Sequence, residues 1–172
     1  MGTNIDGAKL LEFCSYLGNL KHLRRAGWVK RQIENPETVA CHMYRMGVLT
    51  MCLQDTQLDK FKCMKIALVH DMGESIVGDI TPHRRRHSLV PQVTGDEFVS
   101  LWEEYEKADT PEAVLVKDLD KFDMIAQAYE YEQKLNKPGF LEEFFASTSG
   151  IFKHPEVVAW VKTLHERRQN SK

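Results

Sequence analysis

The sequence has no apolar run close to the roughly 18 residues that a membrane-spanning helix needs. Its N-terminal segment lacks the basic stretch followed by an apolar stretch that marks a secretory signal. Asp6 stands where N-myristoylation requires Ser or Thr. The four cysteines form no Cys-x-x-Cys pair, so free thiols are expected rather than disulfide bonds. We therefore expect no membrane partner and a cytosolic protein, with a nuclear location left open.

An excess of charge of either sign is also missing. Lys and Arg number 23, Asp and Glu number 25, and the formal net charge is −2. A polymeric nucleic acid is therefore not an expected partner, and any affinity for phosphate must come from a local site. Hydrophobic residues make up 42% and charged residues 28%, a balance typical of a globular protein that buries a core. The length predicts a single domain over residues 1–172.

Apolar residues recur at helical spacing along most of the chain, and no segment alternates for long as a β-strand does. This pattern predicts an all-α fold, a single bundle of about six or seven helices. Residues that can cap a helix N-terminus precede four of the predicted helices: Asn35, Asp59, Thr94 and Thr110. The helix that begins after Asp59 is expected to end near Gly78.

One predicted helix ends in ionisable rather than apolar residues, because Val69 is followed by His70 and Asp71 and then by Glu74. Helical geometry puts Glu74 one turn beyond His70 and Asp71, so the three side chains can converge. Burial of such groups is costly unless they are paired or bind a metal. A solvated helix end with a capping histidine explains the same residues, so this run alone does not decide for a functional site.

Two further residues raise the odds of a metal site. His42 lies on an apolar helix face, where a single histidine is more often a hydrogen-bonded core residue than a ligand. Asp120 lies in the long helix after Thr110, where an aspartate is usually a surface residue. With His70 and Asp71 they give two imidazoles and two carboxylates on three successive amphipathic helices. Such a donor set suits a divalent transition metal with positions left open for water and substrate.

The order His, His-Asp, Asp is the pattern that names the HD superfamily of metal-dependent phosphohydrolases, and this chain resembles that superfamily. Other segments extend the resemblance: Gly27-Trp28, Pro36-Glu37, His42-Met43-Tyr44-Arg45-Met46, Val69-His70-Asp71-Met72, Ile76-Val77-Gly78-Asp79-Ile80-Thr81-Pro82 and Val116-Lys117-Asp118-Leu119-Asp120. The resemblance covers residues 8–168 and is strongest to the 5′-deoxynucleotidases. It implies that the predicted bundle is a single HD domain.

The resemblance also implies roles for eight residues. The metal ligands would be His42, His70, Asp71 and Asp120, the catalytic carboxylates Glu74 and Asp79, and the substrate-binding residues Arg25 and Trp28. In that family Glu74 would lie near the attacking water, Asp79 would contact the sugar, Trp28 would lie against the deoxyribose, and Arg25 would bind phosphate. A guanidinium matches phosphate oxygens and an aromatic face suits a sugar, but an ordinary basic loop around a core tryptophan explains the segment equally well.

The match to the family is imperfect at three places. Bacterial members have the arginine directly before the tryptophan, where this chain has Gly27; the eukaryotic spacing Arg-x-Gly-Trp fits Arg25. Cys41 precedes the first ligand histidine, where the family usually has an acidic residue, which puts a second hydrogen bond to that histidine in doubt. Family members usually carry a Glu- and Lys-rich stretch, of the kind that can form a lid, before the counterpart of His83-Arg84-Arg85, whereas here these residues directly follow Pro82.

The sequence therefore predicts a metal-dependent 5′-deoxynucleotidase that converts deoxyribonucleoside 5′-monophosphates to deoxynucleosides and phosphate. Its cofactor would be one divalent ion: the resemblance favours Co²⁺ or Mn²⁺, and Zn²⁺, Fe²⁺, Ni²⁺ or Mg²⁺ remain open. The resemblance also implies a homodimer. Two alternatives stay open: an HD phosphohydrolase acting on a cyclic nucleotide or a guanosine polyphosphate, and a catalytically silent nucleotide-binding module.

Overall fold

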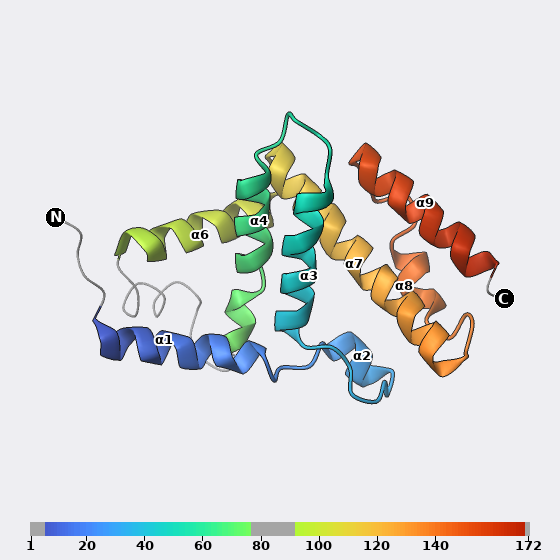
Figure 1. Ribbon diagram of the computed structural model, residues 1–172, viewed down its shortest axis with the longest axis horizontal. Coiled ribbons are helices and arrows are strands. Elements are labelled where there is room, and N and C mark those ends of the chain that lie inside the picture. The colour runs from blue at the N-terminus through green and yellow to red at the C-terminus, as the bar shows by residue number, and fades with distance from the viewer. Residues whose placement is uncertain (1–5, 77–91, 171–172) are drawn as a thin grey trace.

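The computed structural model describes residues 6–76 and 92–170, and within these ranges the regular structure is helical throughout (Figure 1). The prediction of an all-α fold is confirmed. In chain order the elements are α1 (Gly7–Leu20), α2 (Ala26–Lys30), α3 (Val39–Cys52), α4 (Lys60–Val69), the 3-10 helix η1 (Met72–Ile76), α6 (Gln92–Lys107), α7 (Pro111–Leu135), α8 (Glu142–Ser147) and α9 (Pro155–Gln169). None of the helices in the described ranges is long and apolar enough to cross a membrane.

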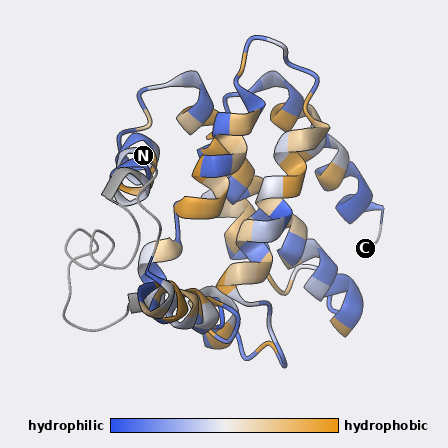
Figure 2. Ribbon diagram, turned by 60° about the vertical axis from the view of Figure 1, so that its left-hand side comes forward, coloured by the Kyte–Doolittle hydropathy of each residue, from blue (hydrophilic) through white to orange (hydrophobic). Residues whose placement is uncertain are grey.

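The core lies where α3, α4 and α7 meet. Helix α4 packs against α3, α6 and α7, and α3 also packs against α7. Met46, Ile66 and Leu119, one from each central helix, are fully buried. Burial of a side chain of this size stabilises the fold by roughly 1.5–3 kcal/mol. Figure 2 shows apolar residues gathered on the central helices and hydrophilic residues along the outer helices and loops. Some of the polar side chains that these helices turn inward, namely His42, Asp120 and the adjoining His70, come together at one buried site.

Two of the predicted helix caps are confirmed. The Asp59 side chain accepts a hydrogen bond from the backbone N–H of Lys62 at the start of α4. The Thr110 hydroxyl accepts one from Ala113 at the start of α7, and Pro111 occupies the first turn. Each cap satisfies a backbone donor that the first helical turn leaves without a partner.

The predicted start of α3 is wrong by three residues. Asn35 is not a cap and has a positive φ of 49°. The helix begins at Val39, and the Thr38 hydroxyl accepts from the backbone N–H of Cys41. The reason is long-range pairing, because Arg25 N–H donates to the Glu37 carbonyl and Val39 N–H donates to the Leu23 carbonyl. These bonds hold the residues before α3 in an extended conformation beside the entry to α2.

Two other predicted helix ends also differ. Helix α6 is already helical at Gln92, so Thr94 lies inside it rather than at its cap. Helix α4 ends at Val69 instead of near Gly78, and the chain continues as η1. The imidazole of His70 contributes to this end, since its Nδ1 lies 2.9 Å from the Ala67 carbonyl oxygen of the last helical turn.

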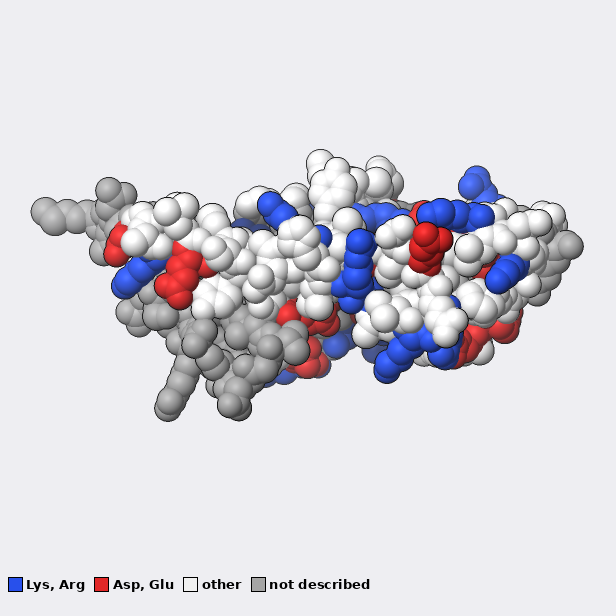
Figure 3. Space-filling view, turned by 90° about the horizontal axis from the view of Figure 1, so that it is seen from below, with Lys and Arg blue, Asp and Glu red and all other residues white. Residues whose placement is uncertain are grey.

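Helices α8 and α9 are tied to α7 by a buried ion pair. The Glu132 carboxylate on α7 accepts from Nε and Nη2 of Arg168 on α9, at 2.7 and 2.9 Å, and from the Leu141 N–H at 2.8 Å. Glu132 and Arg168 are 1% and 6% exposed. On the outside of the molecule, acidic and basic side chains are interspersed over the face seen in Figure 3, in keeping with the small net charge.

Candidate metal centre and adjoining pocket

His42 lies in the first turn of α3 and is fully buried. Its Nδ1 atom is 2.6 Å from Oδ2 of Asp123 on α7. Its Nε2 atom points the other way, 3.3 Å from Oδ1 of Asp120 and 3.9 Å from Oδ2 of Asp71. The two ring nitrogens therefore have different surroundings, and Nε2 faces two of the predicted metal ligands.

His70 lies at the C-terminal end of α4 and is 4% exposed. Because its Nδ1 is hydrogen-bonded to the Ala67 carbonyl, Nδ1 must be the donor, and Nε2 is left as the basic nitrogen. That Nε2 atom lies 3.3 Å from Oδ2 of Asp71. The rings of His42 and His70 are edge to face, with their centroids 5.4 Å apart.

The buried nitrogens of this cluster suit a metal ion. Among the described residues, three buried side-chain nitrogens have no hydrogen-bond partner: Nε2 of His42, Nε2 of His70 and, away from this cluster, Nδ1 of His154. One donor atom from each of His42, His70 and Asp120 lies within 4.8 Å of the others. Buried polar atoms without partners are costly, and two imidazoles beside carboxylates form a donor set for a divalent ion. The residues present therefore fit the metal that the HD pattern implies.

The carboxylates of the cluster are held in their ionised form. Burial opposes ionisation of Asp120, but the adjacent His42 and Lys121 outweigh it and lower its pKa well below the usual range. Burial also opposes ionisation of Asp71, and His70 and His42 lower its pKa nevertheless. Burial lowers the pKa of His42, yet Asp120 and Asp123 raise it to about 9. Metal binding requires deprotonated carboxylates, and both Asp120 and Asp71 are held in that form.

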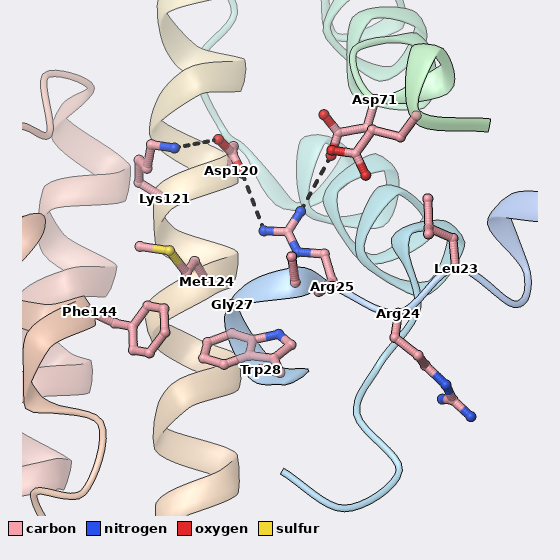
Figure 4. Close-up of a pocket in the computed structure, with 12 residues that line it drawn as sticks. Leu23, Arg24, Arg25, Gly27, Trp28, Asp71, Asp120, Lys121, Met124 and Phe144 are labelled. Atoms are coloured by element: carbon pink, nitrogen blue, oxygen red, sulfur yellow. Dashed lines mark hydrogen bonds and ion pairs between the residues drawn. The ribbon is translucent and has the colours of Figure 1, made fainter. Parts of the chain in front are cut away.

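A pocket of about 590 Å³ opens beside the cluster (Figure 4). It is lined by Leu23, Arg24, Arg25, Ala26, Gly27, Trp28, Asp71, Glu74, Asp120, Lys121, Met124 and Phe144. Arg25 reaches across it, with Nη1 3.3 Å from Oδ2 of Asp71 and Nη2 3.9 Å from Oδ1 of Asp120. Lys121 approaches Asp120 from the other side, with Nζ 2.9 Å from Oδ2. Arg24 points away from these residues in Figure 4.

Glu74 lines the same pocket from η1, and its side chain is exposed. It does not continue α4 as the sequence predicts; its backbone N–H donates to the Asp71 carbonyl at 3.0 Å, which folds the chain back beside the cluster. Helix α1 supports this turn, because the Asn19 amide donates to the Ser75 carbonyl at 3.1 Å. Partial burial and the Asp71 charge raise the pKa of Glu74, and Arg25 opposes them. A carboxylate with a raised pKa is a better proton acceptor.

Trp28 is both a core residue and part of the pocket wall. It is 1% exposed and packs against Phe144 and Tyr131, with ring centroids 4.6 and 5.3 Å away. Its indole N–H donates to Oε1 of Glu37 at 2.9 Å. The two sequence-based interpretations of this tryptophan, packing and contact with a ligand, are therefore compatible.

Of the eight residues with predicted roles, seven lie at this cluster or line its pocket, and Asp79 lies outside the described residues, as do His83, Arg84 and Arg85. Cys41 is exposed, and its thiol accepts from the Thr38 hydroxyl, so Asp123 and not residue 41 supplies a carboxylate to His42.

The sequence-based interpretation missed three neighbours of the cluster. Lys121 pairs with Asp120, Asp123 contacts His42, and the Tyr105 hydroxyl donates to Oδ2 of Asp120 at 3.1 Å. The spacing of Asp123 one helical turn after Asp120 is the signal that could have identified it.

Comparisons with known proteins relate this chain to several others. The HD domain pattern matches residues 17–158. The chain is 47% identical over 175 residues to "5'-deoxynucleotidase HDDC2" of Danio rerio, which covers 92% of this chain and 88% of the relative. It is 46% identical over 182 residues to the protein of the same name from Mus musculus, with 96% and 92% covered. A solved structure of a conserved hypothetical protein from Pyrococcus furiosus superimposes with a TM-score of 0.71 at 32% identity, covering 92% of this chain and 99% of that one.

Proposed function

This chain belongs to the HD domain family, and from that premise we propose that it is a metal-dependent 5′-deoxynucleotidase. Its substrates are deoxyribonucleoside 5′-monophosphates, and its products are deoxynucleosides and inorganic phosphate. The observation that carries the proposal is the buried pair of Nε2 atoms of His42 and His70 beside Asp120. Neither atom has a hydrogen-bond partner, and they adjoin a pocket into which Arg25 and Lys121 bring positive charge. The names of relatives that are 46–47% identical support the choice of reaction.

His42, His70, Asp71 and Asp120 hold one divalent ion in this proposal. When bound, the ion acts as a Lewis acid on the phosphoryl group and lowers the pKa of a water molecule toward about 7. Mixed nitrogen and oxygen ligands accept several first-row metals, and the resemblance of the sequence favours Mn²⁺ or Co²⁺.

The side chains around the ligands supply the rest of the chemistry. Glu74, at the mouth of the pocket, accepts the proton of the water that attacks phosphorus. Arg25 and Lys121 face Asp120 from two sides of the pocket and neutralise the charge of the phosphate. A guanidinium can hold two phosphate oxygens at once, and an ammonium adds a point charge. Asp79 keeps its predicted role at the sugar.

A panel of nucleotides tests this function against its alternatives. Protein freed of metal should release phosphate only after Mn²⁺ or Co²⁺ is added, and fastest from deoxyribonucleoside 5′-monophosphates. The panel also contains the matched ribonucleotides, cyclic nucleotides and guanosine polyphosphates. Faster cleavage of either of the last two classes would assign the protein to another HD activity. Nucleotide binding without turnover under every metal condition would identify a silent binding module.

Trp28 is expected to set the preference for deoxyribose. A 2′-hydroxyl against the indole would be desolvated without a partner, which costs roughly 1–3 kcal/mol, or about fivefold to 150-fold in kcat/KM. We expect Trp28→Ala to reduce the ratio of kcat/KM between matched deoxy and ribo monophosphates, chiefly because the ribonucleotide improves relative to the deoxynucleotide.

Loss of packing at Trp28 needs its own control, because the side chain is 1% exposed. Tyr131 packs on the same indole but does not line the pocket. Tyr131→Leu therefore disturbs the aromatic packing around Trp28 without changing a residue that could contact the sugar. Fold damage lowers kcat/KM for both sugars together, and Tyr131→Leu should therefore leave their ratio unchanged. An unchanged ratio in a folded Trp28→Ala protein would contradict the assignment.

We further propose that the protein is a homodimer and acts in the cytosol. The first proposal depends on the resemblance alone. The second is supported by the four cysteines, all of which are free thiols.

A further inference from the structure

Asp123 is a fully buried carboxylate on α7, one helical turn after Asp120. Both of its oxygens are engaged. Oδ2 lies 2.6 Å from Nδ1 of His42, and Oδ1 accepts a hydrogen bond from Nε of Arg45. The carboxylate therefore joins a predicted metal ligand on α3 to an arginine one turn later on the same helix.

Arg45 is held in place by several acceptors at once. Its Nη1 lies 3.0 Å from both carboxylate oxygens of Glu130, and its Nη2 lies 3.0 Å from Oε1 of Gln127 and 3.5 Å from the Asp123 carbonyl oxygen. Glu37 adds a further charge 3.9 Å from Nη2. With so many contacts the guanidinium has one orientation, and in that orientation it presents Nε–H to Asp123.

These contacts determine which nitrogen of His42 carries a proton. Arg45 and Asp123 form an ion pair, in which the guanidinium can only donate and Oδ1 of the carboxylate accepts. Its other oxygen, 2.6 Å from the ring, then accepts from Nδ1–H of His42. The lone pair of neutral His42 is consequently on Nε2, the atom that lies 3.3 Å from Asp120 and has no hydrogen-bond partner.

We propose that Asp123, clamped by Arg45, is the positioning residue that fixes the tautomer and ring orientation of His42 for metal binding. Carboxylates that accept the second N–H of a ligand histidine orient the ring and raise its basicity. In this chain α7 supplies that carboxylate, in place of the acidic residue expected before His42, where Cys41 stands. The proposal depends on the proposed function only in its choice of metal and reaction.

The decisive variant is Asp123→Asn, which keeps the shape of the side chain but can present an amide N–H to the ring. In metal-free protein above the pKa of His42, ¹⁵N NMR should show the Nδ1–H tautomer in the wild type and loss of it in the variant. Calorimetric titration with Mn²⁺ should show affinity lowered by about 10- to 100-fold. Arg45→Gln, which removes the clamp alone, should lower the affinity by a smaller factor.

Glu132→Gln is the matched control. Glu132 is also a buried carboxylate of α7 paired with an arginine, Arg168, but it does not line the pocket or touch the histidines. The control should destabilise the fold while leaving Mn²⁺ affinity and the His42 tautomer at wild-type values. A folded Asp123→Asn protein with wild-type tautomer and affinity would overturn the proposal, as would an equal loss of affinity in Glu132→Gln.

The outcome is separable from that of the proposed function. A wild type that binds Mn²⁺ and has the Nδ1–H tautomer, but hydrolyses no deoxynucleotide, would refute the activity and leave the role of Asp123 intact. A wild type in which His42 is the Nε2–H tautomer would refute the positioning role whatever the protein hydrolyses.

Discussion

Alanine in place of His70 or Asp120 is expected to remove the bound metal and to reduce hydrolysis to background. His70 supplies a buried Nε2 atom that has no hydrogen-bond partner, and Asp120 supplies a carboxylate that two cations and a tyrosine already hold in place. Loss of a direct ligand lowers metal affinity more than loss of a hydrogen bond to a ligand does, so the affinity should fall by more than about 100-fold. The metal content of dialysed protein and phosphate release from a deoxynucleotide measure the two effects.

Two residues nearby offer matched controls. His154 is a partly buried histidine paired with Asp55 at 3.3 Å, and Asp118 is a buried carboxylate of α7 that accepts from the backbone N–H groups of Lys153 and His154. His154→Ala and Asp118→Ala remove the same chemical groups from positions outside the metal cluster. Both should keep the metal, even if they unfold at a lower temperature. Normal metal content and turnover in His70→Ala or Asp120→Ala would show that the cluster is misassigned.

The sequence points to the predicted ligands of this site because their chemistry is rare where it occurs. Histidine within an apolar helix face, and a His-Asp pair at the end of another, are expensive to bury without a purpose. The helical period then brings His42, His70 and Asp120 onto inward faces of α3, α4 and α7, as the structure has them. For such residues, the local sequence pattern alone predicts the buried position that the structure has.

The supporting residues are harder to predict because their partners are distant in the sequence. Asp123 and Arg45 are 78 positions apart, and either one looks like an ordinary surface charge of a helix until α3 and α7 are packed together. The prediction of where α3 begins is wrong for the same reason. Asn35 followed by a proline is a strong local cap signal, but hydrogen bonds from Arg25 and Val39 to the opposite segment keep the chain extended.

The turn that carries Glu74 could be predicted from the sequence only in part. Helical spacing correctly brings Glu74 near His70 and Asp71, but the α-helix stops at Val69 and a 3-10 helix follows. The proximity survives because one turn of a 3-10 helix takes about three residues, close to the turn of an α-helix. What the sequence does not show is that the turn is held by Asn19 of α1, through the Ser75 carbonyl.

Glu74→Gln is expected to lower kcat by about 10²-fold or more while the protein keeps its metal and its affinity for the substrate. The amide fills the same space but cannot accept a proton from the attacking water. Glu74 lines the pocket beside Asp71, and its pKa is raised by partial burial and by that neighbour, so its carboxylate suits proton transfer. Single-turnover rates, substrate binding and metal content, measured on the same preparation, separate the three quantities.

Glu143→Gln provides the control for that experiment, because it makes the same change of charge at an exposed glutamate that pairs with Arg31 beside an adjacent small cavity. The control should retain wild-type kcat, since its carboxylate does not line the main pocket. If Glu74→Gln loses the metal, Glu74 is itself a ligand, and the proton must be accepted by another group. If the variant keeps both metal and kcat, proton transfer does not need this carboxylate. Only a large fall in kcat with metal and substrate still bound assigns the proton to Glu74, and the inactive complex could then be crystallised with its substrate intact.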